Sequence, residues 1–149
     1  MSNDIIHVIT RLFWAVDHHD WDTLPQVFGE EVLLDYGEPA TLTPTDIVSM
    51  WRPLFTALDA HQHLVGNHLV TASGNAATVT ASFIATHQYA GETWTLGGDY
   101  EFRLLDDAGW RITAMTMTPV WQTGPADLIQ RATGNQKAKL IGRRNICLL

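Results

Sequence analysis

Between His63 and Trp121 the sequence alternates apolar and polar residues over long stretches that are separated by tight turns. The turns fall at Gly74-Asn75, at Gly91-Glu92 and over 106–109, where glycine, asparagine and aspartate favour chain reversal. Successive side chains of a β-strand point to opposite faces, so this alternation predicts strands with one buried face. Long strands joined by tight turns build an antiparallel meander. The rest of the chain therefore has to cover one face of such a sheet.

The first part of the chain has the spacing of helices. Apolar residues recur at steps of three and four from Ile5 to Val16, which predicts a helix over about 3–17 with one buried face. Helices that precede an antiparallel sheet indicate an α+β fold. We expect a curved antiparallel sheet that forms a cone, with the N-terminal helices packed over it. The elements expected between the first helix and the sheet are a short helix over about 20–28, a strand over 32–36, a loop over 37–44 and a helix over about 45–58.

Composition and charge exclude several classes of protein. A chain of 149 residues with 46% hydrophobic and 17% charged residues indicates a single globular domain over 1–149. The tail from about residue 126 is expected to be extended or to contact another subunit. The net charge of −7 opposes nucleic-acid binding, and the single cysteine, Cys147, gives no disulfide framework. No apolar run reaches the roughly 20 residues that cross a membrane, so we expect a cytoplasmic protein.

Five polar residues are predicted to point into the cone. Asp17 continues the buried face of the first helix, where a carboxylate is costly unless a partner meets it. His87 is the one polar member of an otherwise apolar strand face, and His63 begins a strand whose alternation also places Asn67 on its face. Tyr36 ends the first strand with a hydroxyl that needs a partner when it is buried.

Five short segments of the chain have a recognisable order and spacing. They are Val16-Asp17-His18-His19-Asp20-Trp21-Asp22-Thr23-Leu24, Leu34-Asp35-Tyr36, His61-Gln62-His63-Leu64-Val65-Gly66-Asn67, His87-Gln88-Tyr89 and Asp107-Ala108-Gly109-Trp110-Arg111. The set resembles SnoaL-like proteins of the nuclear-transport-factor-2-like superfamily and covers about 13–121. Within that superfamily it resembles scytalone dehydratase most, with lindane dehydrochlorinase a second relative. The resemblance implies the cystatin-like α+β barrel of the superfamily.

The resemblance also implies a role for each matching residue. Asp17 falls on the aspartate that orients the catalytic histidine in both enzymes, and His63 falls on that histidine. Tyr36 falls on a tyrosine that acts through water on the substrate carbonyl, and His87 falls on a second active-site histidine of the dehydratase. These four residues are the catalytic candidates.

Further positions are candidate substrate contacts. Val16 stands where the dehydratase has its other tyrosine, and a valine cannot donate a hydrogen bond. Asp99 lies near the position of an active-site asparagine and changes the charge of the site, so scytalone itself is a doubtful substrate. The remaining candidates are Asn67 and the aromatic residues expected as walls, which are Trp14, Phe55, Phe83, Tyr89 and Trp121.

An imidazole held by a buried carboxylate is a general base, which contributes roughly 10²–10⁴-fold to a proton-transfer rate. The resulting hypothesis is a cofactor-independent enzyme, first of all a dehydratase that acts on a small apolar cyclic hydroxy-carbonyl molecule. An isomerase or a polyketide-type cyclase would begin with the same proton abstraction. A non-catalytic member that binds a small molecule or a protein is the alternative from another class.

Metal binding is the weaker hypothesis. His61, His63, His68 and His87 together with Asp17 could ligate zinc or iron, but the sequence has no His-Glu-x-x-His motif or other strong ligand spacing. The prediction is therefore no metal and no cofactor. The resemblance further implies a homo-oligomer, either a dimer or a trimer.

Overall fold

The computed structural model describes residues 2–134. The helices are α1 (Ser2–Asp17), the 3-10 helix η1 (Leu24–Val27), α2 (Pro44–Thr56) and α3 (Leu128–Thr133). The strands are β1 (Phe28–Asp35), β2 (Pro39–Leu42), β3 (Ala60–Ser73), β4 (Ala76–Tyr89), β5 (Glu92–Asp106) and β6 (Trp110–Thr123). Helices therefore precede a long sheet, and the α+β class is confirmed. The tail begins as α3, while residues 135–149, with Cys147, lie outside the described residues.

The six strands form one sheet in the order β2-β1-β6-β5-β4-β3. Strands β3 to β6 make the antiparallel meander that the alternation predicts. Strand β1 instead runs parallel to β6, so the sheet is mixed and not purely antiparallel. Parallel neighbours need a long connection between them, and the chain from β2 through β5 supplies it.

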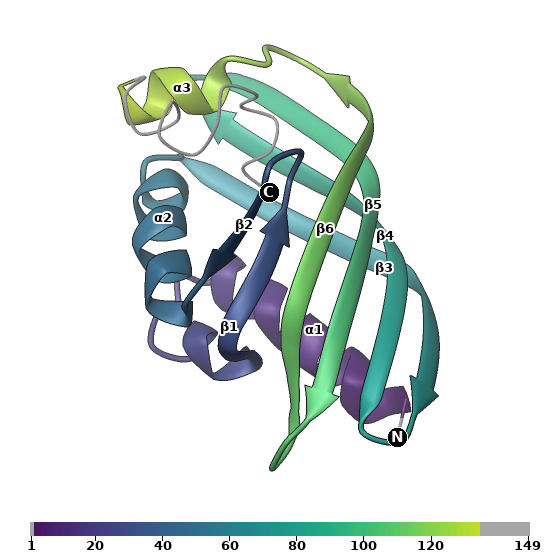
Figure 1. Cartoon of the computed structure of the whole chain (residues 1–149). Coiled ribbons are helices and arrows are strands. Elements are labelled where there is room, and N and C mark those ends of the chain that lie inside the picture. The colour runs from purple at the N-terminus through teal and green to yellow at the C-terminus, as the bar shows by residue number, and fades with distance from the viewer. Residues whose placement is uncertain (1, 135–149) are drawn as a thin grey trace.

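The sheet is strongly curved, and α1 lies across one of its faces, while α2 stands beside β1 and β2 (Figure 1). The long strands bend where their register shifts, between Gly66 and Leu69 in β3, and between Gly97 and Gly98 and between Arg103 and Leu104 in β5. Such bulges bend a strand and increase its twist. The predicted curvature therefore has a local cause in the strands themselves.

Two segments before α2 differ from the sequence prediction. The chain over 20–28 forms turns and the short helix η1, because Phe28 is already a core residue of β1 and is 2% exposed. The predicted loop over 37–44 contains β2, which pairs with β1 along its length. Pro39 is tolerated in β2 because this strand lies at the edge of the sheet.

The bulge in β3 changes which of its residues face α1. Asn67 has a left-handed backbone (φ 54°), and the pairing with β4 shifts there. Beyond the bulge, His68 lines the same groove as His63, whereas Asn67 is exposed. The expectation that Asn67 shares the face of His63 is therefore wrong, because strict alternation holds only in a strand without a bulge.

The buried face of α1 holds the end of this helix against the sheet. Its apolar stripe is buried as the spacing predicts. The Phe13 ring lies 5.2 Å from the His63 ring and 5.3 Å from the Tyr100 ring, centroid to centroid. Burying a side chain such as Phe13 stabilises the fold by roughly 1.5–3 kcal/mol. This packing also sets the position of Asp17, one turn further along α1.

The start of α2 is fixed by a reciprocal cap, and Thr43→Ala should lower the free energy of unfolding by about 1 kcal/mol. The Thr43 hydroxyl accepts from the Asp46 N–H at 3.2 Å, and the Asp46 carboxylate accepts from the Thr43 N–H at 3.1 Å. Urea unfolding measures the loss. Thr41→Ala, at an exposed position of β2, is the control, and an equal loss in both variants would contradict the role of the cap.

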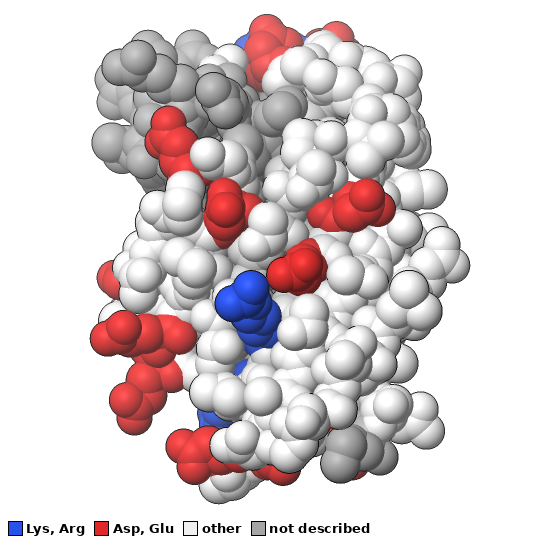
Figure 2. Space-filling model, turned by 45° about the vertical axis from the view of Figure 1, so that its right-hand side comes forward, with Lys and Arg blue, Asp and Glu red and all other residues white. Residues whose placement is uncertain are grey.

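The surface carries more acidic than basic groups on the side that Figure 2 presents, where acidic side chains are spread widely and the basic ones occupy mainly a narrow central area. A nucleic-acid backbone needs a continuous basic surface, which this face does not offer. In the part of the chain that the structure describes, no helix combines the length and apolar character needed to span a bilayer.

Candidate active site

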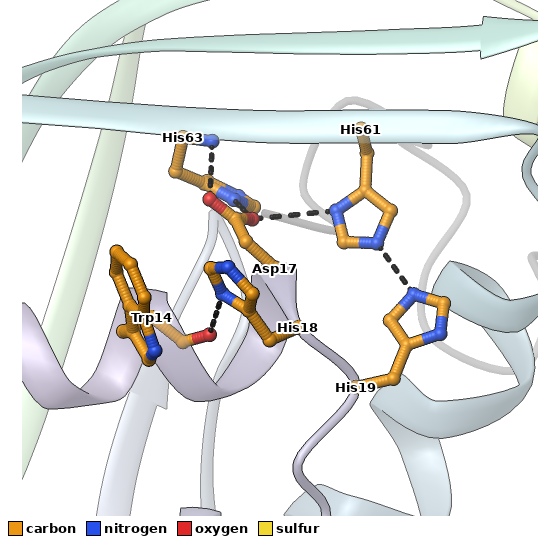
Figure 3. A network of polar contacts seen from close by, with 6 residues as sticks. All are labelled: Trp14, Asp17, His18, His19, His61 and His63. Atoms are coloured by element: carbon orange, nitrogen blue, oxygen red, sulfur yellow. Dashed lines mark hydrogen bonds and ion pairs between the residues drawn. The ribbon is translucent and has the colours of Figure 1, made fainter.

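Asp17 and His63 meet where the end of α1 crosses the start of β3 (Figure 3). The Asp17 Oδ1 atom lies 2.7 Å from His63 Nδ1, and Asp17 Oδ2 accepts the backbone N–H of His63 at 2.8 Å. An ionised carboxylate can only accept, so His63 Nδ1 carries the hydrogen. The second ring nitrogen, Nε2, is then the one that can take up a proton.

The pair is largely shielded from water. The side chains of Asp17 and His63 are 12% and 2% exposed. Burial alone would raise the pKa of Asp17, but the contacts of its carboxylate with His61 and His63 outweigh burial and hold this pKa well below its usual range. Asp17 is therefore a fixed negative charge beneath the imidazole, which stabilises the protonated ring.

A second histidine lies on the other side of the same carboxylate (Figure 3). His61 Nδ1 is 3.3 Å from Asp17 Oδ1, and His61 Nε2 is 2.8 Å from His19 Nε2. His61 Nδ1 is buried and has no hydrogen-bond partner. Asp17, His61 and His63 offer three ligand atoms within 4.8 Å of one another, so these residues have the geometry to hold a metal ion. Burial lowers the pKa of His19, which favours a neutral acceptor there.

His87 lies deeper, with its ring centroid 6.5 Å from that of His63. It is fully buried, stacks on Trp94 and has Nδ1 3.0 Å from the Trp94 carbonyl oxygen. Burial lowers the pKa of His87 to about 3, so the ring is neutral near neutral pH. Its Nδ1–H donates to that carbonyl, which leaves Nε2 as a buried acceptor without a partner. In this state His87 Nε2 accepts a hydrogen bond and does not donate one.

Tyr36 and Val16 line a small cavity inside the cone. The other lining residues are Phe13, Trp51, Phe55, His63 and Met115. The cavity has a volume of about 10 Å³, which is the space of one water molecule. The Tyr36 hydroxyl points to the Met115 sulfur at 3.7 Å. The interior where the sequence places a substrate is thus almost filled by side chains.

A much larger groove opens between α1 and the edge strand β3. Its volume is about 680 Å³, within the range of small-molecule sites. Asp17, His61 and His63 lie in its wall, and Trp14, 66% exposed, stands at its side. Phe13 and His63 line both the groove and the inner cavity. His63 is therefore the point at which the two spaces meet.

The remaining candidates are distributed over other parts of the molecule. Asn67 and Asp99 line a separate hollow of about 530 Å³. Phe83 is a core residue stacked on Tyr100 at 4.3 Å. Trp121 covers Gly97, whose missing Cβ leaves room for the indole, while its neighbour Gln122 bonds to the Trp94 side chain. The structure places Phe55 beside His61 and His63, with ring centroids at 4.6 and 5.8 Å, and leaves Tyr89 half-buried at the end of β4.

Sequence reasoning gave too little weight to His61 and His19. It considered His61 only as a weak metal ligand and gave His19 no role. The available signal was the spacing of His61 and His63, because residues two apart lie on the same face of a strand. Once His63 is placed against Asp17, the same alternation brings His61 to that carboxylate.

The fold and the buried pair define the class of protein: this is a nuclear-transport-factor-2-like α+β protein with a histidine–aspartate pair at the inner face of its curved sheet. Residues 2–116 match the sequence profile of the SnoaL-like domain. The chain belongs to the SnoaL-like family. No curated protein sequence gives a significant match.

Solved structures share this fold. The Kfla4162 protein from Kribbella flavida is 25% identical with a TM-score of 0.82, over 87% of this chain and 96% of that one. A candidate aromatic ring hydroxylase from Novosphingobium aromaticivorans is 26% identical with a TM-score of 0.74, over 85% and 94% of the two chains. A candidate scytalone dehydratase from the same organism is 18% identical with a TM-score of 0.75, over 83% and 87%.

The dehydrochlorinase resemblance also has a structural counterpart. LinA is 10% identical to this chain with a TM-score of 0.75, over 84% of this chain and 89% of that one. The resemblance to SnoaL-like proteins, to a dehydratase and to a dehydrochlorinase is thereby confirmed for the fold.

Proposed function

We propose that this protein abstracts a proton from a small organic molecule without a cofactor, with His63 as the base and Asp17 as its partner. The contact of 2.7 Å between His63 Nδ1 and Asp17 Oδ1 carries the proposal. It fixes the tautomer in which Nε2 is free of hydrogen, and the buried charge stabilises the imidazolium that forms. The backbone contact from His63 to Asp17 makes this arrangement rigid.

The reaction that we favour is the elimination of water from a hydroxy-carbonyl compound. His63 Nε2 takes the proton from the carbon beside the carbonyl, and the electron pair forms the new double bond as the C–O bond breaks. The leaving hydroxide takes this proton from the His63 imidazolium and departs as water, so His63 is neutral again. A hydrogen bond from Tyr36 to the carbonyl oxygen would stabilise the negative charge that develops there in the transition state. Because His87 is neutral, we assign it the role of an acceptor beside the substrate.

The proposed substrate is small, apolar and cyclic. The groove volume of about 680 Å³ suits a molecule of one or two rings. Aromatic side chains gather around His63, with Phe13 and Phe55 in ring contact. The proposed substrate enters through the groove and brings its acidic carbon to His63 where the groove meets the inner cavity.

A second function is favoured by the inner cavity. Its volume of about 10 Å³ leaves no room for a ring beside Tyr36 without side-chain movement. A protein that only binds a molecule in the outer groove would show this arrangement. An isomerase or cyclase is the alternative within catalysis, since both reactions start with the same proton abstraction.

Proton abstraction is tested by hydrogen–deuterium exchange into cyclic ketones and hydroxy-ketones, followed by NMR in heavy water. We expect wild type to accelerate exchange at the carbon beside the carbonyl, together with loss of water from the hydroxy-ketones. His7→Ala, an exposed position on α1, should exchange at the wild-type rate. Exchange without elimination would favour the isomerase or cyclase. Binding without exchange would refute catalysis and favour the binding protein.

The family resemblance also leads us to propose a homo-oligomer. Exposed apolar side chains on the sheet are compatible with a contact between subunits, and they include Leu64, Leu69, Ile84, Val120 and Trp121. The predicted assembly is a dimer or a trimer.

A further inference from the structure

We propose that Asp17, His61 and His63 form a binding site for a divalent first-row transition-metal ion such as zinc. The three side chains provide one carboxylate oxygen and two imidazole nitrogens within 4.8 Å of one another. Imidazole and carboxylate are the usual protein ligands of zinc, together with thiolate. This proposal goes beyond the proton-abstracting function, which uses no metal and gives His61 no role.

His61 provides the strongest observation. Its side chain is 3% exposed, and its Nδ1 has no hydrogen-bond partner although it lies 3.3 Å from Asp17 Oδ1. A buried imidazole nitrogen without a hydrogen bond is costly. A cation between the two atoms removes this cost. Zinc ligands at about 2.0–2.1 Å in tetrahedral geometry lie roughly 3.3 Å apart. The distance from His61 Nδ1 to Asp17 Oδ1 matches this separation, whereas His63 Nδ1, at 2.7 Å from the same oxygen, has to move away from it when the ion binds.

Hydrogen bonds from neighbouring groups orient the proposed metal ligands. His61 Nε2 is 2.8 Å from His19 Nε2, so in the tautomer with hydrogen on His61 Nε2 this hydrogen is donated to His19 and Nδ1 is a ligand atom. Asp17 Oδ2 is held by the His63 backbone N–H, which leaves Oδ1 to face the ion. Ligating histidines and carboxylates are commonly oriented by such outer contacts.

The site is open on one side. All three ligands lie in the wall of the groove between α1 and β3, so an ion and its water can enter from solvent. Three protein ligands and a water complete a tetrahedral zinc site with one exchangeable position. The groove thus provides the entry path that a reversible site requires.

Metal and proton compete for the same atoms. The hydrogen that joins His63 Nδ1 to Asp17 Oδ1 at 2.7 Å would be displaced by the ion. The bound imidazole would then lose the partner that makes it a base. Zinc should therefore inhibit proton abstraction, and this consequence, unlike binding itself, rests on the proposed function.

Zinc binding to tag-free full-length protein is measured by isothermal titration calorimetry, with cobalt as a spectroscopic probe of tetrahedral coordination. We expect one ion per chain, and at least roughly tenfold weaker binding in His61→Ala and in His63→Ala. His19→Ala should weaken binding by a smaller factor. His18→Ala is the matched control, because His18 bonds to the Trp14 carbonyl and does not contact Asp17. It should bind zinc as wild type does.

The results separate this proposal from the proposed function. Wild type that exchanges protons but binds no zinc would overturn the metal site alone, as would unchanged zinc affinity in His61→Ala. Wild type that binds zinc through His61 but exchanges no protons would support the site and refute the catalysis. Where both occur, zinc should inhibit exchange by wild type at concentrations that inhibit His61→Ala less, each protein being compared with itself without zinc.

Discussion

Replacing His63 with alanine should lower the rate of proton abstraction by roughly 10²–10⁴-fold, the usual contribution of a general base. The variant keeps the groove and loses only the imidazole at its wall. Asp17→Asn should cause a loss of similar order, although His63 is still present. The asparagine amide can donate to His63 Nδ1, which favours the tautomer with hydrogen on Nε2, and that tautomer cannot accept the proton.

The measurement is the exchange rate or turnover of the best substrate at saturating and at low concentration. A general base acts in the transition state, so kcat and kcat/KM should fall together while KM changes little. Circular dichroism and thermal unfolding check that both variants remain folded. Equal rates for wild type, His63→Ala and Asp17→Asn would remove the pair from the mechanism. A rise in KM alone would indicate that the Asp17–His63 pair contributes to substrate binding and not to proton abstraction.

Acidification from pH 7 to pH 4.5 should cost roughly 3 kcal/mol of folding stability through His87, at about 1.4 kcal/mol for each pH unit below the unfolded pKa. Burial lowers the pKa of His87 from 6.5 to about 3, while its pKa in the unfolded chain is near 6.5. Between these values the unfolded chain binds a proton that the folded protein does not, so stability rises with pH through this window. Burial also lowers the pKa values of His19 and His68, which adds to the effect in the same direction.

The test is the free energy of unfolding in urea as a function of pH. His87→Phe keeps an aromatic ring beside Trp94 but cannot be protonated, so its stability should change less between pH 6.5 and 4.5 than that of wild type. Its lost hydrogen bond to the Trp94 carbonyl lowers stability at all pH values and does not affect the slope. His7→Gln, at an exposed position on α1, is the matched substitution of a histidine outside the core. Equal slopes for His87→Phe and wild type would contradict the role of His87.

The low pKa of Asp17 acts in a different window. Its stabilising contacts are present above the ordinary carboxyl range and are lost as pH falls through and below that range. The interval from pH 6.5 to 4.5 therefore does not report the protonation of Asp17. Below the ordinary carboxyl range, the free energy of unfolding of Asp17→Asn should fall less with pH than that of wild type.

Residue spacing alone determined the α+β order, the buried face of α1 and the apolar face of β4. Each follows from apolar residues that recur every 3.6 residues in a helix or every second residue in a strand, because burial of apolar side chains favours that spacing within the element itself. The same reasoning placed Asp17 on the buried face and His87 among core residues. Both positions follow from the element in which they occur, so no distant contact had to be known.

Only the tertiary structure decided the parallel pairing of β1 with β6 and the separation of Asn67 from His63. The contacts that join His61 and His19 to Asp17 were also known only from the tertiary structure. The same holds for the side chains that occupy most of the interior of the cone. A bulge shifts the alternation by one residue, and packing between distant elements decides how much space remains. Periodicity identifies the side chains that face inward, whereas the distances among those side chains depend on how the sheet bends.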